Sequence, residues 1–343
     1  MKTLQPLLGV LVLTAIAAGA YLVFQHPAVN RLSKAPTARA DSKTNVRSNT
    51  ATSERHGAVL PLRSSPTDTN TIRRAEYRKK LETASNYYDF VSSIIESARA
   101  GDSDAQYYLS EALNYCNRGY RAYFERPGHT RTVDEALQWA SVRPTVSMDD
   151  VRTVYEKCHR LQEMDPSKWG LADEWLARAT NAGQPAAEAT TAHMLFVKQL
   201  TERAAAADGR ASAQEPKGPR QDPNALLRTA VQSKDPEVLF KIGELQGVLA
   251  DSRDQPPESD PTGSSTHFED TLAWWLVACE RGLDCSENSS WHKSACTNQC
   301  PPRENGVEYI RRVAHESNFY DLELRAKDIR EKLDANAWDE LGL

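Results

Sequence analysis

The sequence predicts an all-α protein, an irregular α-solenoid of stacked helix pairs with one loop fastened by disulfides. Three observations predict it. Between Thr71 and Leu343 the apolar residues recur at helical spacing, strand-like alternation hardly ever exceeds four residues, and one pattern that ends a helix and starts another recurs four times. Recurring helix pairs bury their apolar faces by stacking, so the pattern favours a protein that presents a surface. It names no reaction and no ligand.

The chain begins with a targeting segment, residues 1–25. Residues 7–24 carry no charge and follow Lys2. This run is longer than the usual core of a signal peptide and short for a membrane span. Ala18-Gly19-Ala20 is a possible cleavage site, but the apolar run continues through Phe24, which favours an uncleaved anchor. Either form predicts export, and a buried core helix is the remaining alternative. No Cys lies nearby for lipid attachment.

Residues 26–70 are predicted to be a disordered tether. They are rich in Ser, Thr, Asn, Pro and basic residues, with only isolated apolar side chains, so they cannot bury enough surface to offset the entropy of ordering. Alternatively, the basic side chains lie against anionic lipid. These residues are Arg31, Lys34, Arg39, Lys43, Arg47 and Arg55.

The recurring pattern defines the helical repeat domain, residues 71–343. Each copy has a small or apolar residue four positions before a turn residue, and a helix start follows directly. Glycine adopts the left-handed backbone that closes a helix, and Asp102 or Asp104 can cap the helix that follows the first turn. In another copy the Asp235-Pro236 pair supplies an N-cap and a first-turn proline. The turn residues are Gly101, Gly183, Lys234 and Asn318, and Gly282 keeps the first half of the pattern.

The copies are unevenly spaced. Successive turn residues lie 82, 51, 48 and 36 residues apart, whereas solenoid repeats usually span about 20 to 45. Two insertions rich in Pro, Gly and charge, 204–222 and 251–266, are predicted to be mobile loops. The stretch 117–151 contains helix-compatible pieces, TVDEALQWA among them, broken by proline and glycine.

ARAGDSDAQYYLSEAL resembles the Sel1-like repeat, a relative of the tetratricopeptide repeat, in which a helix ending A-x-x-x-G precedes one that opens x-A-x-x-x-L. ADEWLARATNAGQPAAEA and DTLAWWLVACERG are similar to the first helix and its junction. The resemblance covers about a third of the chain, and it implies stacked helix pairs that bind proteins. Lys234 and Asn318 stand where the family has glycine.

The six cysteines are the disulfide candidates of an exported protein, because their number is even and the compartment is oxidising. Four of them fall within 22 residues of a loop-like segment that has little apolar content. Avoiding partners that adjoin in the loop favours Cys279 with Cys296 and Cys285 with Cys300. Cys116 and Cys158 lie on helical segments and form either a pair or two buried thiols. Zinc held by Cys285, His292, Cys296 and Cys300 is the alternative, although the spacing lacks a C-x-x-C knuckle.

The sequence gives no catalytic motif. The histidines form no H-E-x-x-H pattern, and nucleophile elbows and phosphate-binding glycine loops are missing. A net charge of −5 without a dense basic stripe argues against a nucleic-acid partner. Most large aromatic residues are expected in the core rather than in a groove for peptide or glycan. These are Tyr107, Tyr108, Trp139, Trp175, Trp274 and Trp275.

The sequence therefore predicts a periplasmic protein-protein interaction module or scaffold with no catalytic residue, metal or cofactor, anchored to the inner membrane through its N-terminal segment. Its partner is an envelope protein whose identity and binding residues the sequence does not give. The alternative is a cell-envelope hydrolase whose site is assembled from dispersed carboxylates and histidines. A deep cleft with paired carboxylates would favour the enzyme, and a shallow face lined by aromatic residues and Arg would favour binding.

Overall fold

A computed structural model of the chain describes residues 69–126, 128–143, 146–163, 168–207, 221–253, 266–287, 289, 291–292, 301, 303–314 and 319–341. All of them belong to one compact unit, Ser64–Leu343. Within them, no helix is long and apolar enough to cross a membrane. The predicted targeting segment, nearly all of the predicted tether, the turn at Asn318, and Cys296 and Cys300 lie outside the described residues.

The described part is mostly helical, as the sequence predicts. The region before Gly101 is a helix pair: α2 (Thr69–Thr83) and α3 (Tyr87–Arg99) are separated at Asn86, whose side chain accepts the Asp89 N–H at 2.9 Å. Helix α3 turns one apolar face inward because its apolar residues recur at intervals of three and four. Helix α4 (Ser103–Tyr123) follows directly.

A short hairpin and two helices follow α4. Strands β1 (Glu125–Arg126) and β2 (His129–Thr130) pair antiparallel, an addition to the helices that the sequence predicts. The predicted TVDEALQWA helix is α5 (Val133–Ser141), which begins with a capping box between Thr132 and Glu135. Helix α6 (Met148–Gln162) leads back to α3 and α4.

The later helices form pairs and overlap the predicted insertions. The pairs are α7 (Ala172–Asn181) with α8 (Pro185–Ala207), and α9 (Pro223–Gln232) with α10 (Pro236–Arg253). Helices α8 and α10 therefore continue a few residues into the two predicted loops, whose central residues are not described. The last elements are α11 (Thr266–Glu280), α13 (Gly306–Val313), α14 (Phe319–Ala335) and the short 3₁₀ helix η3 (Trp338–Leu341).

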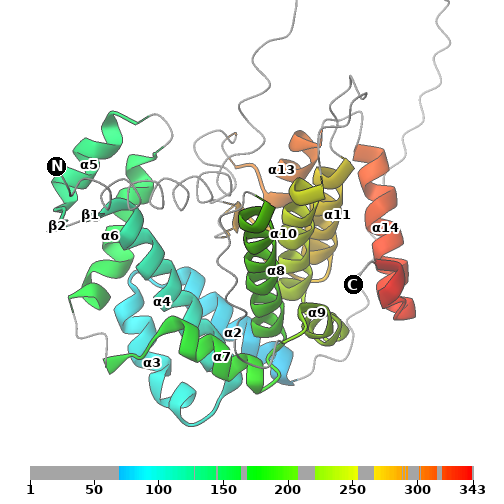
Figure 1. Cartoon of the computed structure of the whole chain (residues 1–343), viewed down its shortest axis with the longest axis horizontal. Coiled ribbons are helices and arrows are strands. Elements are labelled where there is room, and N and C mark those ends of the chain that lie inside the picture. The colour runs from blue at the N-terminus through cyan, green and yellow to red at the C-terminus, as the bar shows by residue number, and fades with distance from the viewer. Residues whose placement is uncertain are drawn as a thin grey trace, which may run out of the picture. The chain divides into compact units, whose positions relative to one another are not determined.

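Helices that follow one another in the chain also pack against one another (Figure 1). Helix α4 contacts α3 and α7, α8 contacts α7, α9 and α10, and α11 contacts α10 and α14. Each of these helices is thereby buried against its neighbours, some consecutive in the chain and others, such as α4 and α7, separated by intervening helices. Helix α2 packs against both α3 and α4.

The predicted turn geometry is confirmed at four positions. The backbone φ angle is +99° at Gly101, +73° at Gly183, +51° at Lys234 and +105° at Gly282, all in the left-handed region. At the first, second and fourth turns the next N–H returns to a carbonyl five residues back, as in Asp102 N–H to Ser97 O at 3.0 Å. Lys234 adopts this conformation with a Cβ atom, so its backbone is strained relative to glycine.

The large aromatic residues pack mostly as predicted. Tyr107, Tyr108, Trp175 and Trp274 are buried, while Trp139 and Trp275 are half-buried. Of the adjacent residues Trp274 and Trp275, only Trp274 is buried in the core, because consecutive side chains of a helix point about 100° apart.

Candidate functional site

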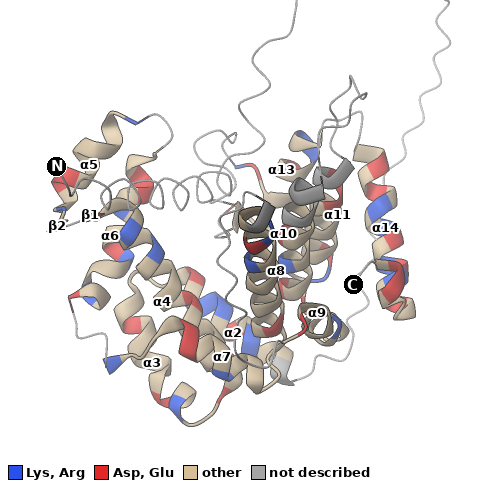
Figure 2. Cartoon of the chain, viewed as in Figure 1, with Lys and Arg blue, Asp and Glu red and all other residues tan. Residues whose placement is uncertain are grey.

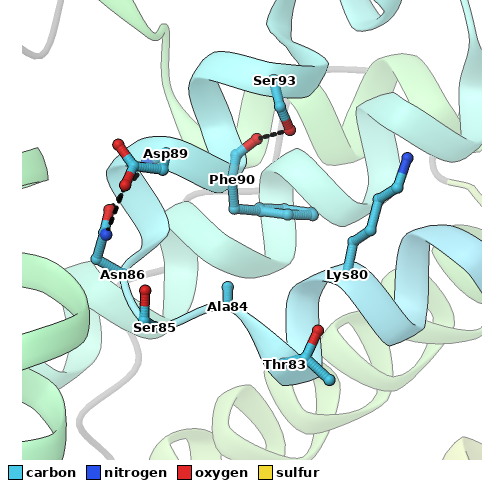
Figure 3. A pocket seen from close by; sticks show the side chains of 8 residues that line it. All are labelled: Lys80, Thr83, Ala84, Ser85, Asn86, Asp89, Phe90 and Ser93. Atoms are coloured by element: carbon cyan, nitrogen blue, oxygen red, sulfur yellow. Dashed lines mark hydrogen bonds between the residues drawn. The ribbon is translucent and has the colours of Figure 1, made fainter.

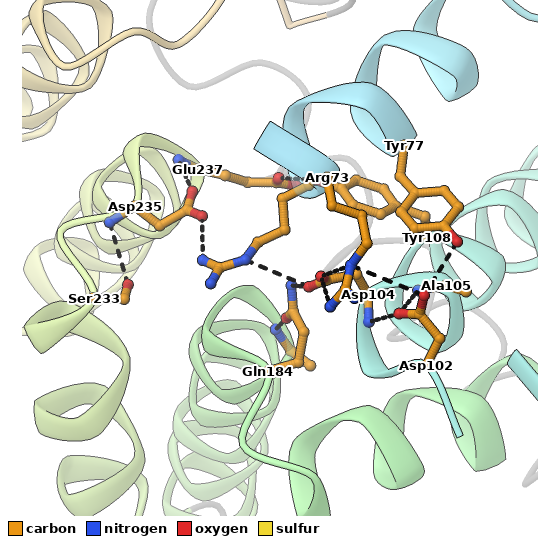
Figure 4. Close-up of polar contacts among 12 residues, drawn as sticks. Arg73, Tyr77, Asp102, Asp104, Ala105, Tyr108, Gln184, Ser233, Asp235 and Glu237 are labelled. Carbon is orange, nitrogen blue, oxygen red and sulfur yellow. Dashed lines mark hydrogen bonds and ion pairs between the residues drawn. The ribbon is translucent and has the colours of Figure 1, made fainter. Parts of the chain in front are cut away.

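Three arginines on one face of α2 meet the starts of two other helices. Arg73, Arg74 and Arg78 lie at positions that share a helix face. They contact Asp102 and Asp104 at the start of α4, and Asp235 and Glu237 at the start of α10. We call these seven residues the arginine–carboxylate network, and Figure 4 shows the part of it near Arg73. Acidic side chains at helix N-termini also suit the positive end of the helix dipole.

The α4 side of the network is built on a capping residue. Asp102 accepts the N–H groups of Asp104 and Ala105 at 3.0 and 3.2 Å, and this capping positions Asp104. Asp104 is buried, and the Arg73 Nη2 donates to its Oδ2 at 2.8 Å. Arg74 Nε lies 3.4 Å from the other Asp104 oxygen. A buried carboxylate costs free energy unless cations and donors surround it, and here they do.

The α10 side repeats this arrangement. Asp235, directly after the strained Lys234, accepts the Glu237 N–H at 2.9 Å. Its two oxygens take Arg74 Nη1 at 2.7 Å and Arg78 Nη2 at 3.3 Å. Arg78 also donates from Nε to Glu237 at 3.0 Å. Arg74 therefore joins the starts of α4 and α10, which lie far apart in the sequence.

Glu237 is the most elaborately held carboxylate of the network. Besides Arg78, it accepts the hydroxyls of Tyr107 at 3.0 Å and Tyr108 at 2.8 Å, both from α4. Burial by itself would raise the pKa of Glu237, but the Arg78 charge and the Tyr108 hydrogen bond outweigh it and lower the pKa. Burial raises the pKa of both tyrosines, so they remain hydroxyl donors at neutral pH.

The start of α8 joins the network through Gln184. Its side-chain oxygen accepts the Ala187 N–H at 2.6 Å, which caps the helix after the turn at Gly183. Its amide nitrogen donates to Asp104 Oδ1 at 3.4 Å, the oxygen that Arg74 also approaches (Figure 4). The helix starts that follow three of the predicted turns, at Gly101, Gly183 and Lys234, thus lie in one hydrogen-bonded cluster.

Further charged groups continue along α4, α8 and α10 beyond the network. Lys241 Nζ lies 3.1 Å from Glu244, and that carboxylate is the main reason that the pKa of Lys241 is raised. Burial raises the pKa of Glu111 on α4 and lowers that of His193 on α8. Each of these three titratable groups senses the charge of Lys241 or Glu244, so the charges on α4, α8 and α10 are coupled to one another.

A shallow hollow among the described residues lies away from the network. It lies where α2 ends and α3 begins, has a volume of about 330 Å³, and opens widely to solvent (Figure 3). Its lining includes Lys80, Asn86, Asp89 and Phe90. Asp89 is its single acidic residue, and that carboxylate already takes Arg160 at 3.0 Å and the Asn86 amide at 2.7 Å. The lining therefore holds no pair of carboxylates for glycoside hydrolysis.

The cysteines pair differently from the predicted scheme in the loop. Cys116 on α4 is joined to Cys158 on α6, so the predicted pair is present and the buried-thiol alternative is wrong. Cys279 is joined to Cys285, not to Cys296, and the prediction that Cys285 pairs with Cys300 is also wrong. The left-handed turn at Gly282 reverses the chain and brings Cys279 and Cys285 to a Cα separation of 5.7 Å, within reach of a disulfide.

The zinc alternative fails at Cys285, whose sulfur is taken up by the disulfide. Among the described residues, no group of three or more His, Cys, Asp and Glu side chains is arranged to hold a metal. His292 is buried, with its Nε2 at 3.9 Å from Glu304, which in turn accepts from Arg312 at 2.7 Å. His129 lies 3.3 Å from Glu135 at the start of α5, and His159 stacks on Tyr155. The described histidines are thus dispersed over separate elements.

Reasoning from the sequence missed the arginine–carboxylate network. The one signal in the sequence is three closely spaced arginines on the helix that precedes Gly101. Comparison with protein-family models, with curated proteins and with solved structures finds no match to this chain. The arguments for function therefore come from the chain's own residues.

Proposed function

We propose that the folded part is a divergent Sel1-like, tetratricopeptide-related helical array that serves as a protein interaction scaffold. The observation that carries the proposal is the shared geometry at Gly101, Gly183 and Lys234, where a left-handed residue closes one helix and a capped helix starts at once. Repeated junctions of this kind stack helix pairs and present extended surfaces for partners. The resemblance of the junction sequences to the Sel1-like repeat points the same way.

The charges of the network support a scaffold more than a hydrolase. Asp104, Asp235 and Glu237 are each held by arginine, and Glu237 also by two tyrosines. A general acid or base must reach a substrate, whereas these carboxylates spend their hydrogen bonds on neighbouring helices. Their arrangement fixes the relative positions of helix starts, and such fixing makes a surface rigid enough to bind at low entropic cost.

Export places the scaffold in the periplasm, and the uncharged run 7–24 would hold it at the inner membrane. The disulfides Cys116–Cys158 and Cys279–Cys285 fit an oxidising compartment. The partner on this proposal is an envelope protein.

Site-specific photo-crosslinking in intact cells tests the proposal. A photoreactive amino acid replaces Tyr115 on α4, Met194 on α8 or Val142 after α5, three apolar side chains that are at least 40% exposed. We expect a discrete protein adduct at one or more of these positions, and weaker adducts at the exposed polar control Lys198, which lies one helical turn from Met194. The proposal fails if no position gives an adduct above that control while the protein is folded and exported.

A further inference from the structure

Two arginines lie over the ring of a tryptophan on α5, and a third arginine lies close to one of them. The guanidinium carbons of Arg131 and Arg143 lie 4.7 and 4.4 Å from the centroid of the Trp139 ring. Arg126 on β1 is close enough for its charge to act on Arg131. We call Arg126, Arg131, Trp139 and Arg143 the arginine–tryptophan patch. Stacking of guanidinium on indole holds the cations without neutralising them.

The backbone fixes two of these cations further. Arg131 donates to the Tyr123 carbonyl at 2.8 Å, and Arg143 donates to the Trp139 carbonyl at 3.1 Å. Each guanidinium carries five N–H donors, so both keep donors for another group. The side chains are therefore ordered before any partner arrives, which lowers the entropic cost of binding.

Within the described part of the chain, none of the three arginines forms an ion pair with a carboxylate. Burial and the charges of Arg126 and Arg143 lower the pKa of Arg131, which shows that the like charges repel one another. This differs sharply from Arg73, Arg74 and Arg78, which are matched to four carboxylates. A cluster of cations that repel and are not neutralised is complementary to an anion.

Two exposed apolar side chains belong to the same stretch of chain as Arg143. Val142, which directly precedes Arg143, is 73% exposed, and Met148 at the start of α6 is 44% exposed. The Val146 N–H donates to the Arg143 carbonyl at 3.0 Å, a turn that keeps this segment close to the end of α5. An occupant that meets both features carries an anionic group and an apolar group.

The surrounding carboxylates restrict the size of the anion. Glu135 on α5 acts on Arg131, and Asp149 follows Met148 directly. Both signs of charge are interspersed along the neighbouring α6, as Figure 2 shows. An extended anionic surface such as a bilayer or a nucleic acid would meet these carboxylates and be repelled, whereas one acidic side chain would not.

We propose that the arginine–tryptophan patch binds a short segment of a partner protein in which an acidic residue adjoins an apolar one. The acidic side chain accepts hydrogen bonds from Arg131 and Arg143, and the apolar side chain packs on Val142 and Met148. This inference rests on the proposed scaffold function and names the chemistry of one partner segment.

Selection from a displayed library of random dodecapeptides on the full-length protein tests the inference. We expect the selected peptides to be enriched in Asp or Glu next to Leu, Ile, Val or Phe. Fluorescence anisotropy of a selected peptide should show at least a tenfold loss of affinity for the double variant R131Q/R143Q. The matched control R121Q/R152Q removes two exposed arginines from neighbouring helices and should change the affinity less than twofold.

Four results would count against the inference. If the selected peptides lack acidic residues, or bind R131Q/R143Q and wild type equally, the patch is not the site, although the scaffold function stands. If no peptide is enriched at all, both proposals lose support. If the protein binds vesicles of phosphatidylglycerol and phosphatidylcholine, and R131Q/R143Q abolishes that binding, the occupant is a lipid surface. Circular dichroism of each variant checks that it is folded. The V142S variant keeps all charges and should also weaken binding of the peptide.

Discussion

The part of the molecule from α2 to α10 and the part from α11 to α14 fasten their helix junctions by different physical means. In the first part the helix starts after Gly101, Gly183 and Lys234 meet in the arginine–carboxylate network, whose carboxylates are largely buried. In the second part the junction at Gly282 is closed by the short disulfide Cys279–Cys285.

Ion pairs are present in both parts, but their surroundings differ. Between α11 and α14, Arg325 pairs with Glu269 and Asp270, Arg281 pairs with Asp334, and Arg330 pairs with Glu280, and most of these side chains are substantially exposed. Exposed pairs contribute little to stability, whereas a buried charge that loses its partner is costly. The stability of the first part is therefore more sensitive to the loss of a single charge than the stability of the second part.

Removal of one arginine from each part should lower the stability of the protein by clearly different amounts. Arg78→Met leaves Glu237 and Asp235 short of a cation in a buried place, so we expect a loss of about 3 kcal/mol in the free energy of unfolding. The matched change Arg325→Met, which removes an arginine with two carboxylate partners near the surface, should cost about 1 kcal/mol or less. Urea titration followed by circular dichroism measures both. Equal losses would contradict the contrast between the two parts.

The two disulfides close loops of different length, so their removal should destabilise the two parts unequally. Replacing both Cys116 and Cys158 by Ala opens a loop with a sequence separation of 42 residues, and the chain-entropy relation gives a loss of about 4 kcal/mol. The same change at Cys279 and Cys285, separated by 6, should cost about 2 kcal/mol. Thermal melts of the oxidised proteins check this order. A larger loss at the short loop would mean that Cys279–Cys285 holds more structure than its own turn.

Substitutions at two turn residues should have opposite signs. Gly101→Val places a Cβ in the left-handed region, which costs about 1 to 2 kcal/mol, and no neighbouring atom lies close enough to add a clash. Lys234→Gly relieves the same strain at the third junction and should be neutral or stabilising. Differential scanning calorimetry of both variants decides the matter. Melting temperatures that fall by the same amount would show that the two turns are not equivalent.

The smallest expected effect is a pH dependence confined to the first part. The pKa of Glu237 is lowered in the folded protein, so its contribution is present above the ordinary glutamate pKa and is lost as pH falls through the lower, folded value. Glu237→Gln should therefore flatten the decline of the urea midpoint below about pH 4. Glu280→Gln, on α11, is the matched change among the more exposed ion pairs of the second part. A steeper decline in the Glu237 variant would contradict the assignment.

Local chemistry made the turns predictable, and long-range contacts made the network unpredictable. Gly101, Gly183 and Asp235-Pro236 fix their conformations through residues within one helical turn, so the sequence suffices there. Arg78 and Glu237 are 159 residues apart, and no local pattern connects them. The predicted partner of Cys279 was wrong for the opposite reason. Its actual partner, Cys285, lies across the tight turn at Gly282, which the sequence predicts but the predicted pairing did not take into account. The arginine–tryptophan patch was equally hidden, because the hairpin that brings Arg131 to Trp139 has strands of only two residues each.

Helix α2 is the first described element to leave the ribosome, and this order has a consequence for folding. Arg74 is synthesised 161 residues before Asp235. At about 5 to 20 residues per second, translation supplies that partner roughly 8 to 32 seconds later. Before that, Arg73 and Arg74 can pair only with Asp102 and Asp104 at the start of α4. The carboxylates at the start of α10 are therefore the last members of the network to be supplied.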